Sequence, residues 1–272
     1  MIVSIIIVII VIKIAIQMPP PGPPTTVEIS IVPPKFKVEF GEPIDYYDGL
    51  PESPNPKIKE AFERGKKFKE EYRFYEAIRE FKRCLKFKPK DEERGALFIL
   101  IGNCFYFQSK YKEAFSWYKK GMKICKKIDD KEGLATIYNN IGLIHHSQGN
   151  YQEALEWLEK SSKICESIGY QEGLAATYNN IGGIHDSQGN YQEALVWYMK
   201  DLEISERIGD QAGLATTYNN IGSIHKAQGN YQEALVWYEK SKKIYERIGY
   251  QKGLAATYNN IGSIYDSQGN YQ

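Results

Sequence analysis

One pentapeptide, YNNIG, occurs four times in this chain, and each copy begins 40 residues after the one before it. The copies lie at residues 138–142, 178–182, 218–222 and 258–262. The similarity extends beyond the pentapeptide, since residues 171–210 and 211–250 are identical at 29 of 40 aligned positions. Self-similarity at a fixed period predicts stacked structural units, each packed mainly against its neighbours. This period constrains the fold more than the length of the chain does.

Each unit is predicted to form two antiparallel helices. Leu134, Tyr138 and Ile141 follow one another at steps of four and three, as residues on one helix face do. Gly142 in the first helix and Ala154 in the second recur in every complete later unit. A glycine inside a helix costs about 1 kcal/mol against alanine, so its recurrence indicates that the two helices cross closely there.

The turns between these helices carry their own sequence pattern. Gly149 suits the left-handed residue that ends a helix. Asn150 stands three residues before Glu153, the spacing of a capping box, and Asp130 has a side chain that can cap the first helix of its unit. Tyr170, at the equivalent position 40 residues later, has no side-chain acceptor suited to this role. Tight turns and antiparallel hairpins are therefore expected.

This pattern resembles the tetratricopeptide repeat family. The matching residues are Tyr138, Ile141, Gly142, His145, Ala154 and Leu158 in one unit, Phe98, Ile101, Gly102, Phe105, Ala114 and Tyr118 in the unit before it, and Gly65, Phe68, Ala77, Phe81 and Pro89 in the first. The first unit resembles the 34-residue form, and the others resemble the 40-residue form of kinesin light chain and Pins-type adaptors. The resemblance implies an all-α, right-handed superhelical solenoid of antiparallel helix hairpins, whose first helices line a concave groove.

Three parts of the chain are expected from this pattern. They are an apolar N-terminal segment at residues 1–18, a proline-rich spacer at 19–56 and a repeat array at 57–272. Within the array we expect units at about 57–91, 92–130, 131–170, 171–210 and 211–250, and a partial unit at 251–272. The spacer contains VEISIV and KFKVEF, whose alternation of apolar and polar residues is compatible with a short hairpin.

The apolar run at residues 2–16 is open to several interpretations. It is shorter than the roughly 20 residues that span a bilayer, and Lys13 interrupts it. No basic residue precedes it and no small-residue cleavage site follows, which weakens a match to a secretory signal. A membrane anchor, an uncleaved signal and a buried start remain open. A cytoplasmic location is favoured, with membrane anchoring as the alternative.

The paired asparagines of YNNIG are the first residues to consider for binding. Amides both donate and accept hydrogen bonds, so a ladder of them suits the backbone of an extended peptide. The predicted groove residues are Asn103, Asn139, Asn140, Asn179, Asn180, Asn219, Asn220, Asn259 and Asn260. In the family that the chain resembles, such asparagines contact bound peptide. Alternatively, one asparagine of each pair bonds to a neighbouring helix and fixes repeat stacking, and both roles can coexist.

The family's carboxylate clamp is only partly present. Asn103 and Asn140 occupy its two asparagine positions, but its lysine and arginine positions fall at Ile99, Ala176 and Asn180. Recognition of a free peptide carboxylate is therefore not expected. Residues further along the groove vary between units, and they either set partner specificity or reflect neutral drift. One turn on they are Leu143, Gly183, Ser223 and Ser263, and after them come the specificity candidates His146, Asp186, Lys226 and Asp266.

The motifs of an enzyme are missing from the sequence. It contains no phosphate-binding loop, no nucleophile elbow and no H-E-x-x-H motif, so we predict neither catalysis nor a cofactor. His145, His185 and His225 recur every 40 residues, but helices pack about 8 to 10 Å apart, too far for neighbouring imidazoles alone to share a metal ion. We expect these rings to pack. The cysteines, Cys84, Cys104, Cys125 and Cys165, show no metal or redox spacing and are expected to be reduced and buried.

Charge is distributed unevenly along the array. Residues 57–127 contain 21 Lys or Arg and 10 Asp or Glu, whereas residues 128–272 contain 11 and 18. Helical repeats can also read RNA bases, but the asparagine-bearing units lie in the acidic part, which disfavours phosphate. The basic part has five lysines that could attract an acidic partner or an anionic membrane, or simply form a solvated face. They are Lys119, Lys120, Lys123, Lys126 and Lys127.

The sequence as a whole favours a protein-interaction scaffold that binds an extended or helical peptide. The alternative is the regulatory or sensor portion of a larger signalling protein, and RNA binding is the less favoured third interpretation. The last helix has no partner helix in this sequence, so Leu254, Tyr258, Ile261 and Ile264 are expected to form an exposed apolar stripe. That stripe would permit self-association.

Overall fold

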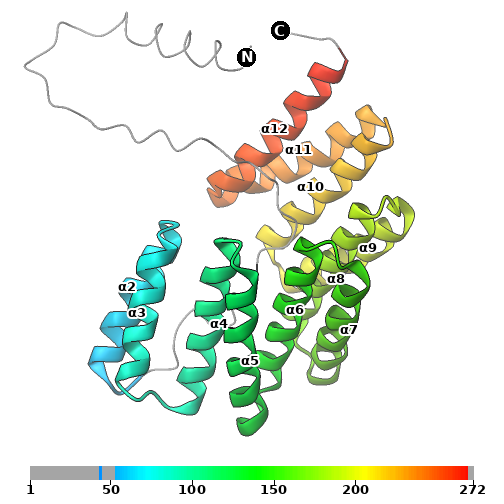
Figure 1. The fold of residues 1–272 in the computed structure, drawn as a ribbon. Helices are drawn as coiled ribbons and strands as arrows, with labels where there is room; N and C mark the ends of the chain where they lie inside the picture. Colours follow the sequence, from blue (N-terminus) through cyan, green and yellow to red (C-terminus); the bar gives the residue numbers. More distant parts are fainter. Residues whose placement is uncertain (1–42, 45–52, 269–272) are drawn as a thin grey trace, which may run out of the picture. The chain divides into compact units, whose positions relative to one another are not determined.

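The computed structural model describes residues 43–44 and 53–268, which belong to one compact unit spanning Val38–Gln272. Eleven helices joined by short turns make up this described part, which contains no strand (Figure 1). Their bounds are α2 Pro56–Glu70, α3 Phe74–Lys86, α4 Asp91–Phe107, α5 Tyr111–Ile128, α6 Lys131–Ser147, α7 Tyr151–Ile168, α8 Gln171–Ser187, α9 Tyr191–Ile208, α10 Gln211–Ala227, α11 Tyr231–Ile248 and α12 Gln251–Ser267.

The predicted N-terminal features lie outside the described residues. These features are the apolar run at residues 2–16 and the two alternating segments of the spacer. In the part of the chain that the structure covers, no helix combines the length and the apolar character needed to cross a bilayer.

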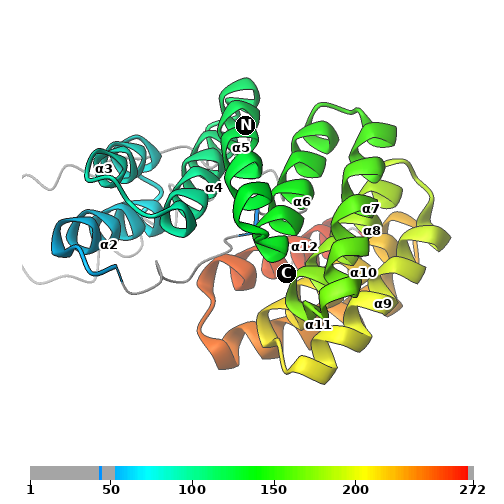
Figure 2. The ribbon, with the colours of Figure 1, turned by 90° about the horizontal axis from the view of Figure 1, so that it is seen from below.

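Consecutive helices pair into antiparallel hairpins, from α2 with α3 to α10 with α11, and α12 packs on α11. First helices of successive hairpins also contact one another, as α4 does with α6 and α6 with α8. No comparable contact joins the second helices within the described array. The array therefore curves with its first helices on the concave side (Figure 2). The predicted all-α fold, a solenoid of helix hairpins, is confirmed.

Close crossing of the two helices in a hairpin depends on a glycine, as predicted. A Cβ atom on Gly182 would lie 2.6 Å from Cε1 of Tyr198, and the same clash occurs between Gly222 and Tyr238. We expected Ala194 to face this glycine, but the nearest side chain belongs to Tyr198, four residues later. Side chains on a helix lean toward its N-terminus, so the Tyr198 ring reaches back over the turn that carries Ala194.

The turns inside the hairpins differ between early and late units. Gly149, Gly189 and Gly229 have φ of +79°, +76° and +78°, the left-handed values that glycine adopts easily. Tyr72 and Ser109 occupy the matching turns of the first two hairpins and have φ of 57°. The early turns therefore hold a backbone conformation that is less favourable for these residues.

Helix capping matches the prediction in the turns between hairpins but not in the turns inside them. The Asp130 carboxylate accepts a hydrogen bond from the backbone N–H of Gly133 at 2.9 Å, and Asp210 caps α10 in the same way. The predicted capping box at Asn150 is wrong, because its side chain makes no cap hydrogen bond. Its ψ of 68° differs from the extended backbone that usually aims an N-cap side chain at the helix.

The last helix buries more apolar surface than the sequence suggested. Ile264 is fully buried against α11, and Leu254 and Ile261 are half-buried, so the predicted stripe is wrong at these positions. Tyr258 is 50% exposed. At the N-terminal end of α12, the Lys252 ammonium lies 5.6 Å from the ring centroid of Tyr72, in the turn between α2 and α3. The first hairpin and the last helix therefore approach each other.

Candidate functional site: the asparagine groove

The paired asparagines lie on the first helices α6, α8, α10 and α12, which form the concave side of the array. Asn139 and Asn140 are fully buried, whereas Asn259 at the last unit is exposed. Burial of a polar amide is favourable only when its hydrogen bonds are satisfied, so each of these side chains requires partners.

Amide-to-amide hydrogen bonds run from unit to unit, and we call them the asparagine ladder. In the units that begin at α8, α10 and α12, the second asparagine donates through Nδ2 to Oδ1 of the first asparagine in the unit before. The bonds are Asn180 to Asn139 at 2.9 Å, Asn220 to Asn179 at 3.3 Å and Asn260 to Asn219 at 3.1 Å. This geometry gives the stacking role a direct hydrogen-bonding basis.

Asn140 carries an additional role, because it holds the main chain of a distant residue. The backbone N–H of Ile44 donates to Asn140 Oδ1 at 2.9 Å, and Asn140 Nδ2 donates to the Ile44 carbonyl at 3.1 Å. Asn103 Nδ2 donates to the same carbonyl at 3.1 Å. Ile44 is half-buried and the preceding Pro43 is buried. The two asparagines thus bind both backbone polar groups of one residue.

Hydrogen bonds from the protein fix the orientation of these two amides. Asn103 Oδ1 accepts from the Tyr118 hydroxyl at 2.7 Å and from Asn140 Nδ2 at 3.1 Å. Asn140 Oδ1 also accepts from Asn139 Nδ2 at 3.2 Å. All four hydrogen-bonding positions of the Asn140 amide are therefore used, two of them by Ile44.

The later units have no asparagine at the position equivalent to Asn103. In the repeat alignment, the position of Asn103 on α4 corresponds to the position one helical turn after the YNNIG asparagines. Later units have other residues there. Those residues are Leu143, Gly183, Ser223 and Ser263. Among the described residues, capture of main chain by two asparagines therefore occurs only between α4 and α6.

Asn179 has a different environment, which the sequence analysis missed. Its Nδ2 donates to the Asp201 carboxylate at 2.8 Å and to Thr217 Oγ1 at 2.9 Å. Asp201 is 2% exposed and also accepts from Thr217 and Ser205, and burial raises its pKa to about 6. Serine stands at the equivalent positions in the neighbouring units, so comparison of the repeats would have singled out Asp201. Those serines are Ser161 and Ser241.

The proposed specificity residues lie about two helical turns beyond the asparagines of the ladder. His146, Asp186 and Lys226 are half-buried, and Asp266 is exposed. Burial raises the pKa of Asp186 to about 6 and lowers the pKa of both His146 and Lys226. His146 Nε2 lies 2.9 Å from Ser187 Oγ in the next unit, and Lys226 donates to Ser263 at 2.9 Å. The partly desolvated charges of Asp186 and Lys226 would act strongly on a nearby ligand.

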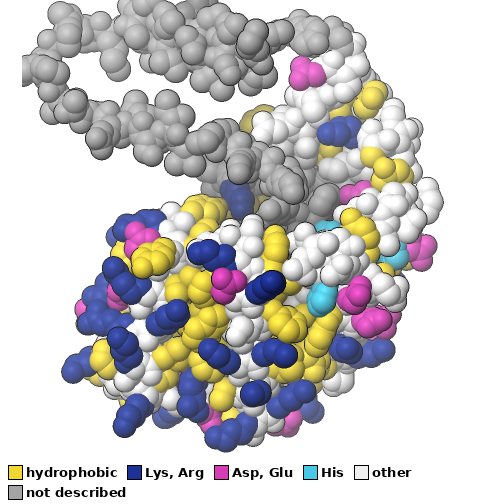
Figure 3. Space-filling model, viewed as in Figure 1, with side chains coloured by type: hydrophobic (Ala, Val, Ile, Leu, Met, Phe, Trp, Pro, Cys, Tyr) yellow, Lys and Arg dark blue, Asp and Glu magenta, His cyan; other side chains and the backbone are white. Residues whose placement is uncertain are grey.

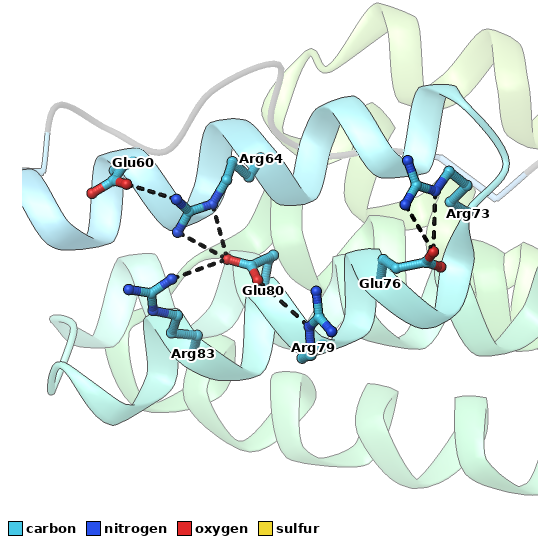
Figure 4. Close-up of polar contacts among 7 residues, drawn as sticks. All are labelled: Glu60, Arg64, Arg73, Glu76, Arg79, Glu80 and Arg83. Carbon is cyan, nitrogen blue, oxygen red and sulfur yellow. Dashed lines mark hydrogen bonds and ion pairs between the residues drawn. The ribbon is translucent and has the colours of Figure 1, made fainter.

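The basic end of the array contains a cluster of arginines around one carboxylate. Glu80 is 6% exposed, and its oxygens lie 3.1 Å from Arg64, 3.6 Å from Arg79 and 3.6 Å from Arg83 (Figure 4). Arg64 also pairs with Glu60 at 2.6 Å, so three guanidinium groups face two carboxylates and leave a positive surplus of one. In the view of Figure 3, Lys and Arg side chains cover much of the surface of α2 to α5.

Several lysines of α5 have partners within the protein. Lys120 Nζ lies 3.7 Å from the centroid of the Trp117 ring, Lys119 Nζ lies 5.1 Å from that of Phe115, and Lys127 donates to Asp91 at 2.6 Å. Lys160, Lys200 and Lys240 repeat the first contact over Trp157, Trp197 and Trp237. An acidic partner or anionic membrane for this face stays a prediction.

The recurrent histidines and the cysteines contribute to packing. The His145 ring meets Phe115 edge to face at 6.4 Å. The four cysteines are buried, as predicted, and burial raises the pKa of Cys84 and Cys125 to about 12. Within the described residues, no group of three or more metal-ligating side chains could hold an ion.

Comparison with known proteins places this geometry in a family. Residues 133–207 and 213–272 match the model of the tetratricopeptide repeat. No curated protein sequence matches the chain. The resemblance to kinesin light chain and Pins-type adaptors in particular stays a prediction.

Three solved structures illustrate the similarity of fold. The Rap conjugation gene regulator of plasmid pLS20, solved with a Phr peptide, aligns with a TM-score of 0.68 at 16% identity over 74% of this chain and 56% of that one. A STAND ATPase with a tetratricopeptide repeat sensor, from Pyrococcus horikoshii, gives 0.63 and 18%, over 76% and 32%. The apo quorum sensor NprR of B. thuringiensis gives 0.58 and 16%, over 81% and 63%.

The chain thus spans between about one third and two thirds of these three proteins. Its helix hairpins, its interhelical glycines and the family match all indicate the same type of repeat. The chain is a tetratricopeptide repeat protein.

Proposed function

We propose that the repeat array is a protein-interaction scaffold that binds an extended peptide in the groove lined by its first helices. The observation that carries this proposal is the capture of Ile44, whose N–H and C=O are both bonded by Asn140. An amide pair that binds one main-chain segment in this way has the geometry needed to bind another.

The chemistry of the groove suits a peptide better than a small charged ligand. Asparagines bind any backbone regardless of its side chains, whereas His146, Asp186 and Lys226 differ from unit to unit and would select side chains of the ligand. The Rap regulator, similar in fold, was solved with a peptide. That similarity supports peptide as the ligand class.

A second proposal is that the array serves as the regulatory or sensor part of a larger signalling protein. The similarity to a STAND ATPase that contains a tetratricopeptide repeat sensor supports this assignment. It is compatible with peptide binding, because a sensor needs a ligand. RNA binding is less favoured, since acidic residues outnumber basic ones in the asparagine-bearing units.

Selection from a phage-displayed library of random 12-residue peptides on the full chain tests the first proposal. We expect enriched peptides to lose at least tenfold in affinity for a chain with Asn140→Ala and Asn180→Ala, which removes groove donors and acceptors. Lys163→Ala is the matched control, because Lys163 is 73% exposed on the second helix α7. Peptides that bind the double variant and the parent equally would place the binding surface elsewhere. Helical circular dichroism and thermal unfolding show whether each variant is folded.

A further inference from the structure

Ile44 is held in the groove as a ligand would be. It lies 59 residues from Asn103 and 96 residues from Asn140 in sequence, and the bonds that hold it are to its backbone atoms. Its N–H makes one of these bonds and its carbonyl makes two. Such contacts do not continue any helix of the array.

Pro43 suits this position for two reasons. Proline has no N–H, so burying it adds no donor that would need a partner. In any peptide ligand, proline favours extended backbone in the residue before it, so a segment with proline at this position is predisposed to bind in an extended conformation. A partner segment with proline before a β-branched aliphatic residue would meet the same requirements.

We propose that Asn103 and Asn140 form a subsite for an extended Pro-Ile segment, and that the chain's own Pro43 and Ile44 fill it in competition with peptides from other proteins. This inference rests on the proposed peptide-binding function and adds the ligand chemistry and an internal competitor. The internal segment regulates access, because a peptide reaches the asparagines only when Ile44 leaves them.

The expected size of the competition follows from the tether. Eleven residues, 45–55, separate Ile44 from the start of α2. Tethers of this length give effective concentrations on the order of 1 mM. If the internal segment has an intrinsic dissociation constant of about 10 to 100 μM, a free peptide would bind roughly 10- to 100-fold more weakly to the occupied groove.

The test uses the full chain and a fluorescein-labelled peptide with the sequence of residues 39–49, EFGEPIDYYDG. Fluorescence anisotropy gives its affinity for the parent and for a variant with Ile44→Pro, which lacks the backbone N–H that donates to Asn140. We expect the variant to bind at least tenfold more tightly. Equal affinity for the two chains would overturn internal competition.

Two controls identify the subsite. In the Ile44→Pro background, Asn140→Ala should abolish binding, whereas Lys163→Ala, an exposed change on the second helix α7, should leave it within about twofold. A peptide with N-methylisoleucine at the position of Ile44 lacks the N–H and should bind at least tenfold more weakly. Equal binding of the methylated peptide would overturn the subsite.

Failure of this inference is distinguishable from failure of the proposed function. If the Ile44→Pro variant and the parent bind library-selected peptides equally, and Asn140→Ala still weakens their binding, only the internal competitor is refuted. If neither chain selects any peptide that depends on the asparagines, the proposed function itself fails.

Discussion

The unit formed by α4 and α5 and the unit formed by α8 and α9 have the same hairpin fold but use their polar residues differently. In the first, Asn103 joins Asn140 in holding a main-chain segment. In the second, Asn179 is directed toward the buried Asp201 and Thr217. The comparison teaches that a repeated motif supplies a uniform set of amides, and that non-repeated neighbours decide whether each amide binds a ligand or stabilises the fold.

The largest expected loss of stability follows from a substitution in the α8–α9 unit. Asn179→Ala removes a donor to a buried carboxylate, and we expect it to lower the free energy of unfolding by about 3 kcal/mol. Urea unfolding, fitted with a nearest-neighbour repeat model, measures the loss. Adding Asp201→Ser, the residue of the neighbouring units, should restore more than half of it. A loss that persists in the double variant would show that Asn179 does not act through Asp201.

The pH dependence of stability sharpens the same comparison. The pKa of Asp201 is raised to about 6 in the folded chain, above the ordinary value of 3.8, so folding favours its protonated form. Its contribution to stability is therefore present at low pH and is lost as pH rises from about 4 through 6. The unfolding free energy of Asp201→Ser minus that of the parent should increase by about 2–3 kcal/mol between pH 4 and 7. A difference that does not change with pH would contradict this assignment.

A smaller effect is expected in the α4–α5 unit. Asn103→Leu introduces the residue that the next unit has as Leu143, and it removes the acceptor for Tyr118 and one donor to Ile44. We expect a loss of about 1–2 kcal/mol and faster hydrogen exchange at the Ile44 amide. Tyr118→Phe is the control, since it removes only the hydroxyl. Unchanged exchange in Asn103→Leu would mean that Asn140 alone protects Ile44.

The smallest expected effect concerns the turns of the two units. Ser109 has φ of 57°, whereas its equivalent Gly189 has φ of +76°. Ser109→Gly should raise the free energy of unfolding by about 0.5–1 kcal/mol, because glycine adopts this conformation without strain. Gly189→Ser should lower it by a similar amount. Thermal unfolding of both variants would contradict the comparison if the two shifts had the same sign.

The sequence predicted the repeat fold well because periodic packing is a local property. Tyr138, Ile141 and Gly142 recur at helical spacing, and the structure places these residues where hairpin packing requires them. The capping role of Asn150 was less predictable, since it depends on a ψ angle that residue type alone does not determine.

The candidate site was predicted in its residues but not in their division of roles. The asparagine pairs were identified from YNNIG, and their bonds to one another follow from stacking geometry. The capture of Ile44 was not predictable, because it joins residues 59 and 96 positions apart without any local pattern. Asp201 was overlooked because attention fell on what the units share, although its difference from Ser161 and Ser241 was visible in the sequence.

The approach of Lys252 to the ring of Tyr72 has a consequence for the kinetics of the groove. In a solenoid, each unit is normally coupled only to its neighbours. Here a cation–π contact connects the first hairpin with the last helix, and at an exposed site it contributes about 0.5–1 kcal/mol, close to thermal energy. Spontaneous fluctuations separate such a contact readily. The rate at which a peptide enters and leaves the groove is therefore expected to depend on the salt concentration and on residues at both ends of the array, far from the asparagines that we propose bind the peptide.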